Sequence, residues 1–147
     1  MNIFIDADSC PKAVRDLVIR RANKLNIKLI LAANRPIPCG NVQMEICSKD
    51  ENAADDRIVE LAQAGDLVIT RDVPLAKRLI EKMINVIDDR GRMFNANNIN
   101  EFLSLRNFKV SLAENGLGIE RTASYDKKEL KIFADSFDRI LTKIKNN

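Results

Sequence analysis

The sequence predicts a three-layer α/β/α fold with a mostly parallel central sheet. Short apolar runs, which are typical of buried strands, alternate with segments of about 10 to 15 residues that have the apolar spacing of helices. Apolar residues make up 46% of the 147 residues and charged residues 31%, a composition typical of globular proteins. This length fits one domain, so we expect residues 1–147 to form a single domain with C-terminal helices.

The first predicted unit is a strand, a helix and a second strand. Residues 3–5 form an apolar run that ends at Asp6, as expected for a buried strand. Pro11 suits the first turn of the following helix. The apolar face of that helix comprises Val14, Leu17, Val18, Ala22 and Leu25. Residues 27–33 form a second apolar run, which completes a β-α-β pattern.

The next segment predicts an edge strand and a helix. Residues 35–41 contain two prolines and a glycine and are expected to form a loop. Residues 42–46 alternate between apolar and polar side chains, which is typical of a half-exposed strand near a sheet edge. We expect a helix over residues 53–64, ended by Gly65.

Two more strands and a helical tail complete the prediction. Residues 67–70 and 85–87 are short buried strands, and Pro74 begins the helix between them. The apolar residues of the tail recur at helical spacing: Ile99, Phe102, Leu103, Leu130, Phe133, Phe137, Ile140, Leu141 and Ile144. Strands that alternate with helices imply a sheet covered on both faces.

The composition excludes several kinds of chemistry. The chain has no histidine, and its three cysteines lack Cys-x-x-Cys spacing, so it cannot by itself supply a histidine-based triad or a four-ligand zinc site of these residues. No apolar run approaches the roughly 20 residues that span a bilayer, and no signal peptide precedes Asp6. We therefore expect a cytoplasmic protein with reduced thiols, no membrane association and chemistry carried by carboxylates.

Charge is distributed unevenly along the chain, although the net charge is only +3. Residues 37–72 hold eight acidic and three basic side chains, whereas residues 1–36 hold three acidic and seven basic ones. An acidic centre with basic flanks suits a cation site whose rim meets phosphates. Charges mixed over a solvated surface are the alternative explanation.

Aspartates follow three of the predicted strands. Asp6 and Asp8 follow the first strand, Asp72 the fourth, and Asp88 and Asp89 the fifth. Ligands of open parallel sheets bind beyond the carboxyl ends of the strands, so these side chains are expected at one edge. Aspartate also caps helices, and for Asp72 this structural role is about as well supported as a binding role.

A helical wheel adds Asp55 to these acids. Asp55 falls within the apolar arc of its helix, near Ile58, whereas Asp56 falls on the opposite side. A carboxylate on a packed face needs a partner or a metal ion. Clustered aspartates suit Mg²⁺ or Mn²⁺, which can activate water against a phosphodiester without an imidazole. The candidate catalytic residues and ligands for one or two such ions are Asp6, Asp55 and Asp72, with Asp8 as a further candidate.

Several motifs resemble those of the YaiI/YqxD family of bacterial proteins. Residues 6–11, Asp-Ala-Asp-Ser-Cys-Pro, are similar to its opening motif D-A-D-x-C-P. Residues 65–70, followed by Asp72, and residues 90–91 are also similar, and the likeness covers essentially the whole chain in order. The chain departs from the pattern at Asp89, where relatives usually have proline.

The family pattern is in turn similar to that of PIN-like nucleases. That resemblance implies a PIN-like fold and metal-dependent cleavage of RNA, with Asp6, Asp55 and Asp72 at the positions of the nuclease acids. We expect Arg71, Lys77 and Arg90 to bind the backbone phosphates of the substrate. The resemblance concerns fold first, because a shared fold does not guarantee activity.

A phosphatase is a rival interpretation. Residues 6–9 also resemble the D-x-D-x-[TV] motif of haloacid-dehalogenase-type phosphatases. In that case Asp6 would be the nucleophile, Asp8 the general acid/base and Lys77 a phosphate ligand. The short distance to the second motif leaves no cap domain, and Asp55 would have no role.

A non-enzymatic RNA- or protein-binding module on a degenerate PIN-like scaffold is the third interpretation. Aromatic residues make up only 5% of the chain, so RNA binding would depend on backbone phosphates and on salt. The apolar face of the C-terminal helix fits either the core or a homodimer surface. Cys10, beside Pro11, is expected to be a packed structural thiol rather than a nucleophile.

Overall fold

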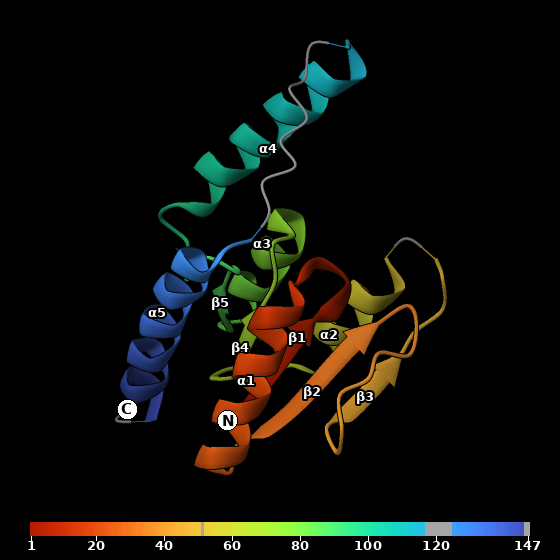
Figure 1. Cartoon of the computed structure of the whole chain (residues 1–147). Helices are drawn as coiled ribbons and strands as arrows, with labels where there is room; N and C mark the ends of the chain where they lie inside the picture. Colours follow the sequence, from red (N-terminus) through yellow and green to blue (C-terminus); the bar gives the residue numbers. More distant parts are fainter. Residues whose placement is uncertain (51, 117–124, 146–147) are drawn as a thin grey trace.

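A six-stranded sheet lies between two layers of helices in this computed structural model (Figure 1). The structure describes residues 1–50, 52–116 and 125–145. The strands are β1 (Asn2–Asp6), β2 (Lys28–Ala33), β3 (Gln43–Ile46), β4 (Leu67–Ile69), β5 (Asn85–Ile87) and β6 (Met93–Phe94). The helices are the 3₁₀ turn η1 (Ala7–Ser9), α1 (Lys12–Leu25), α2 (Ala53–Leu61), α3 (Val73–Glu81), α4 (Ile99–Glu114) and α5 (Lys127–Lys145).

The strand order is β3-β2-β1-β4-β5-β6, with β1 in the interior of the sheet. All neighbouring strands run parallel except β5 and β6. The carboxyl ends of β1 and β4 are adjacent, because Ile5 of β1 is paired in register with Ile69 of β4. This order brings the residues after β1 and β4 together at one edge.

Side chains of β1 alternate between two cores. Ile3 and Ile5 pack with α1 and α5, whereas Phe4 packs with α2 and α3. All three side chains are at most 1% exposed. The predicted three-layer fold with a mostly parallel sheet covered on both faces is confirmed.

Helices α1 and α5 form the layer on one face. The stacked rings of Phe133 and Phe137, with centroids 5.4 Å apart, fill the space beneath α5. A two-pronged contact joins the helices, in which Arg21 donates to both carboxylate oxygens of Asp138 at 2.9 and 3.1 Å. The apolar face of α5 is thus largely used by the core, as one of the two sequence interpretations proposed.

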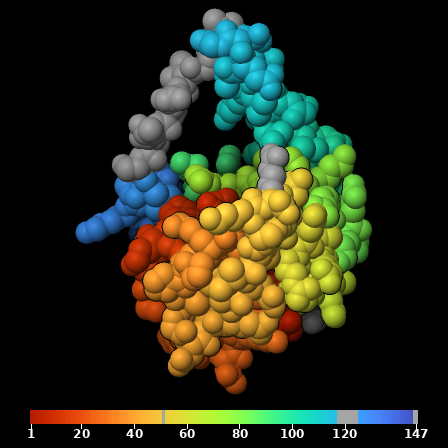
Figure 2. Space-filling model, turned by 90° about the vertical axis from the view of Figure 1, so that its right-hand side faces the viewer, coloured from red at the N-terminus to blue at the C-terminus, as the bar shows by residue number. Residues whose placement is uncertain are grey.

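Helix α4 extends away from the sheet (Figures 1 and 2). Ile99 at its start is buried, but Leu105 and Phe108 are 50% and 62% exposed. Among the described residues, no helix is both long and apolar enough to cross a membrane.

Two sequence expectations for the elements are wrong in detail, and one strand was not expected. Helix α2 ends at Leu61 rather than at residue 64, because Ala62 turns to an extended backbone and Asp66 accepts the Gln63 N–H at 2.9 Å. Leu25 does not belong to the buried face of α1 and is 37% exposed. Strand β6 was not expected, since its two residues are too short to show a periodicity.

Candidate acidic site

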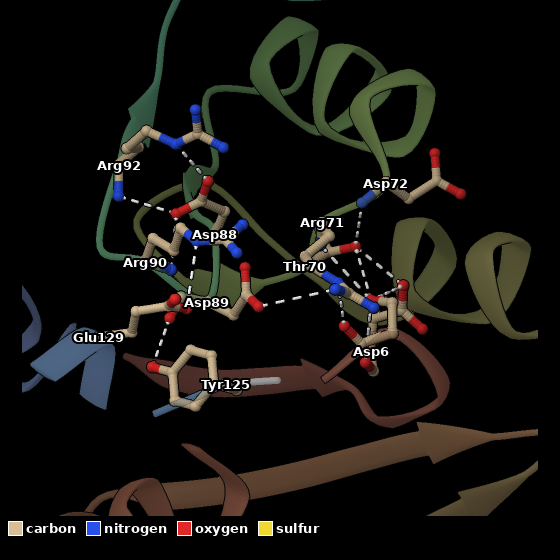
Figure 3. A network of polar contacts seen from close by, with 11 residues as sticks. Asp6, Thr70, Arg71, Asp72, Asp88, Asp89, Arg90, Arg92, Tyr125 and Glu129 are labelled. Atoms are coloured by element: carbon tan, nitrogen blue, oxygen red, sulfur yellow. Dashed lines mark hydrogen bonds and ion pairs between the residues drawn. The ribbon is translucent and has the colours of Figure 1, made fainter. Parts of the chain in front are cut away.

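Asp6 is the buried centre of the candidate site. Its side chain lies at the end of β1 and is 4% exposed. Oδ2 accepts hydrogen bonds from Thr70 Oγ1 at 2.8 Å and from Ser9 Oγ at 2.9 Å (Figure 3). Burial raises the pKa of Asp6, the two hydroxyl groups lower it, and the charges of Asp72 and Asp8 raise it further.

Asp72 is a helix cap as well as a neighbour of Asp6. Its Oδ1 accepts the Leu75 N–H at 3.1 Å at the start of α3. Its backbone N–H donates to Thr70 Oγ1 at 3.0 Å. The capping role expected as one alternative is confirmed, and Thr70 links the end of β4 to both aspartates.

Asp55 approaches the same place from α2. Burial raises its pKa to about 7, together with the charges of Asp72 and Asp6 and a side-chain hydrogen bond to Asp72, while the charge of Arg78 opposes the shift. Asp56, the next residue, is exposed and pairs with Arg78 at 2.8 Å. The expected inward position of Asp55 and solvated position of Asp56 are both confirmed.

Asp8 is oriented toward the end of β2. Its Oδ2 accepts the Asn34 N–H at 2.8 Å, and its Oδ1 is 4.0 Å from Arg35 Nε. Asp8 therefore holds the turn after β1 against β2, and its charge adds to the repulsion at Asp6. Its predicted role as a metal ligand stays a prediction.

The candidate ligands are carboxylates, the type of ligand that Mg²⁺ and Mn²⁺ prefer. Within the described ranges, no three carboxylate or thiol side chains stand in a ready-made arrangement around a single ion. Asp55 and Asp72 are nevertheless close enough for their charges to repel, and the charge of Asp6 acts on both. Mg²⁺ commonly takes one or two carboxylates and keeps several waters, so such a pair suffices. A cation would also relieve the repulsion that raises the pKa of Asp55.

The acids after β5 have a different environment. Asp88 is 1% exposed and accepts the N–H groups of Arg90 and Arg92 at 2.9 Å each, with Arg92 Nε at 2.7 Å. Asp89 is 2% exposed, with one oxygen 3.8 Å from Arg71 and no hydrogen-bond partner for the other in the described part of the chain. Burial raises the pKa of Asp89, and Arg71 lowers it.

The three basic residues expected to bind substrate do not lie together. Arg71 Nε donates to the Ser9 carbonyl at 2.8 Å, and Arg90 Nε is 3.3 Å from Glu129 Oε2. These two arginines line one pocket, whereas Lys77 is exposed on α3 and does not line it. Only Arg71 directly contacts a residue that touches Asp6.

Neither Ser9 nor Thr70 was among the candidate site residues taken from the sequence. Their hydroxyl groups are the donors that hold Asp6. The available signals were a serine three residues after Asp6 and a buried threonine two residues before Asp72. Neither spacing identifies a partner until β1 and β4 are known to be neighbours.

The Cys10 thiol is not activated. Burial raises its pKa to about 12, and Asp89 adds to this while Arg15 opposes it. A thiol with such a pKa holds its proton at neutral pH and is a poor nucleophile. These properties suit the structural role expected for Cys10.

Comparison with known proteins gives one consistent result. A family profile described as "Uncharacterized BCR, YaiI/YqxD family" matches residues 4–143. The UPF0178 protein of Treponema denticola is 46% identical over 145 residues, which cover 97% of this chain and 93% of that protein. The UPF0178 protein PA5247 of Pseudomonas aeruginosa is 40% identical over 147 residues, which cover 98% of this chain and 92% of that protein. No solved structure matches the chain significantly.

Proposed function

The chain belongs to the YaiI/YqxD family, and we propose that it is a divalent-metal-dependent nuclease that hydrolyses RNA phosphodiester bonds. One observation carries the proposal. Asp6, Asp55 and Asp72 come from three elements to one edge of a parallel sheet, and their charges repel. We refer to these three residues as the acidic cluster.

The repulsion has little compensation from the protein. Two of the groups that touch Asp6 are neutral hydroxyls, and the cation that acts on Asp55 is Arg78, whose guanidinium pairs with Asp56. Like charges held together in a half-buried place cost free energy unless a cation joins them. A divalent ion would supply that charge.

Each residue of the site then has a distinct task. Asp55 and Asp72 would bind the ion, and Asp6 would orient the attacking water. Both hydroxyl groups donate to Asp6 Oδ2, which leaves Oδ1 to accept a hydrogen bond from that water. A bound Mg²⁺ or Mn²⁺ would lower the pKa of the water and offset the charge on the scissile phosphate.

Metal binding tests the site directly. We expect Mn²⁺ to bind the wild type in calorimetric titration, and the Asp6→Asn/Asp72→Asn variant to bind at least about tenfold more weakly. Asp56→Asn is the matched control, because Asp56 adjoins Asp55 but is exposed, and its affinity should stay within about twofold. Equal Mn²⁺ affinities in the wild type and the double variant would contradict metal binding at the acidic cluster.

Cleavage of a labelled single-stranded RNA tests the activity. We expect cleavage with Mn²⁺, none with EDTA, and loss of cleavage in Asp55→Asn. Covalent labelling of Asp6 by a phosphate donor, abolished in Asp6→Asn, would instead establish the phosphatase. RNA binding without cleavage in the presence of any metal ion tested would support the third interpretation, a non-enzymatic RNA-binding module.

A further inference from the structure

A second, oppositely charged feature lies beside the acidic cluster. A cavity of about 320 Å³ is lined by the residues after β4 and β5, by β6 and by α4. Its cationic lining residues, which we call the basic pocket, are Arg71, Arg90, Arg92, Arg106 and Lys109. The acidic lining residues are Asp88 and Asp89, both at most 2% exposed.

The fold holds part of the basic pocket in place. Arg92 Nε is 2.7 Å from Asp88, and its guanidinium carbon lies 5.3 Å from the centre of the Phe102 ring. Arg71 is fixed by the Ser9 carbonyl. A guanidinium group has several N–H donors, so these contacts leave others for a ligand. Such preordered arginines suit a phosphate group.

Two further cations have no acidic partner in the part of the chain that the structure describes. Arg106 and Lys109 are exposed on α4, and no carboxylate of the described residues lies within 4 Å of either. Among the described residues, Arg106 donates a hydrogen bond to the side-chain oxygen of its neighbour Asn107 at 3.3 Å. As far as the described residues go, the α4 side of the pocket is positively charged without a paired carboxylate, which favours an anion from solvent.

The pocket also has an apolar part of its lining. The apolar lining residues are Val73, Phe94, Phe102, Leu105 and Val110. A ligand that has both an anionic group and a flat apolar part would match both kinds of lining residue. A nucleotide has this character, and a cavity of about 320 Å³ is at the lower end of the sizes typical of small-ligand sites.

Arg71 connects this pocket to the acidic cluster. Figure 3 shows it between Asp89 and Asp6, with its guanidinium 3.8 Å from Asp89. Its Nε donates to Ser9, the residue whose hydroxyl donates to Asp6. A strand in the basic pocket would thus pass directly to the acidic cluster.

We propose that the basic pocket binds one nucleotide of single-stranded RNA next to the phosphodiester bond at the acidic cluster. This inference rests on the proposed nuclease function for the identity of the strand. Arg71, Arg90 and Arg92 contact the phosphate, and Arg106 and Lys109 attract the strand from α4. The pocket is too small for a duplex.

The test uses binding without catalysis. A fluorescent single-stranded RNA of about 12 nucleotides is titrated with the full chain in EDTA, at about 0.1 M salt, and followed by anisotropy. We expect Arg106→Glu/Lys109→Glu to bind at least about tenfold more weakly than the wild type. The slope of log affinity against log salt should fall by about 1.4, because two phosphate contacts are lost.

The matched control is Arg20→Glu/Lys24→Glu on α1, which changes the net charge equally and lies outside the pocket. Its affinity should stay within about threefold of the wild type. Arg106→Gln/Lys109→Gln should show an intermediate loss, and circular dichroism should show unchanged helix content in all variants.

Each contrary result has one meaning. Equal losses of RNA affinity in the α4 and α1 variants would contradict binding in the basic pocket, because they would show that RNA is attracted only by the net charge. Duplex RNA that competes as well as the single strand would overturn the choice of ligand. Binding that depends on Arg106 and Lys109 without cleavage in Mn²⁺ would overturn the nuclease proposal and leave the basic pocket standing.

Discussion

Two groups of aspartates lie at the same edge of the sheet, and their surroundings are opposite. In the acidic cluster, Asp6 receives hydrogen bonds from hydroxyl groups and is repelled by Asp72. In the turn after β5, which we call the arginine turn (residues 88–92), Asp88 receives two backbone N–H groups and the Arg92 guanidinium. The residue type and the position after a parallel strand are the same in both.

The difference shows that burial by itself does not identify a functional carboxylate. Asp88 is 1% exposed and Asp6 is 4% exposed, yet the donors of Asp88 include a positive charge and those of Asp6 do not. The charge of Asp88 is neutralised by an arginine, so this carboxylate stabilises its turn. The charge of Asp6 is not neutralised by its charged neighbours, which are themselves acidic, so this carboxylate would gain from a bound cation. We therefore expect removal of a carboxylate charge to destabilise the protein in the arginine turn, and to stabilise it at Asp55 in the acidic cluster when no metal ion is present.

The largest effect is expected in the arginine turn. Asp88→Ala removes the acceptor of three N–H groups and leaves Arg92 without its anion. We expect the free energy of unfolding to fall by about 3 to 5 kcal/mol in urea denaturation. Asp56→Ala, which breaks an exposed pair with Arg78, should cost less than about 1 kcal/mol. A loss in Asp88→Ala no greater than this control would contradict the structural role of the turn.

A smaller effect is expected at Thr70, which serves the acidic cluster. Thr70→Val keeps the shape but removes the donor to Asp6 and the acceptor of the Asp72 N–H. We expect a loss of about 2 kcal/mol in stability and about tenfold in Mn²⁺ affinity. Thr70→Ser, which keeps the hydroxyl, should retain most of the metal affinity. If Thr70→Val bound Mn²⁺ as tightly as the wild type, Thr70 would have no role in metal binding.

The smallest effect, of opposite sign, is expected at Asp55 in EDTA. Because the pKa of Asp55 is raised from 3.8 to about 7 in the folded protein, folding favours the protonated carboxyl group. The stability from this group is present below about pH 4 and is lost as the pH rises to about 7. Solvent reaches part of Asp55, so we expect a loss of about 1 to 2 kcal/mol.

Asp55→Asn should remove this pH dependence and be more stable than the wild type at about pH 8 in EDTA. Saturating Mn²⁺ should reverse the order, because the ion stabilises only the protein that binds it. Urea denaturation with and without the ion measures both effects. A wild type that is equally stable at about pH 5 and about pH 8 would contradict the repulsion within the acidic cluster.

The local patterns predicted much of the site. The apolar run before Asp6 gave the strand end, and the helical wheel distinguished Asp55 from Asp56, because both depend on backbone periodicities of a few residues. The same reasoning could not place Asp8. An aspartate after a strand can face several neighbours, and only the adjacent end of β2 supplies the Asn34 N–H that it accepts.

The basic pocket was also beyond prediction. Arg90 and Arg106 are far apart in the sequence, and each alone looks like a solvated surface charge. They line one cavity because β6 reverses the chain after β5 and α4 then begins beside it. Strand β6 has only two residues, which are too few for an apolar periodicity, so the sequence does not predict that the chain reverses there.

The sequence by itself determined most of the elements, their order and the family, because apolar spacing and motifs are properties of neighbouring residues. The tertiary structure alone decided which acids meet one another and which meet arginines. That choice depends on placing β4 between β1 and β5, since charges interact through space over a few ångströms and not along the chain.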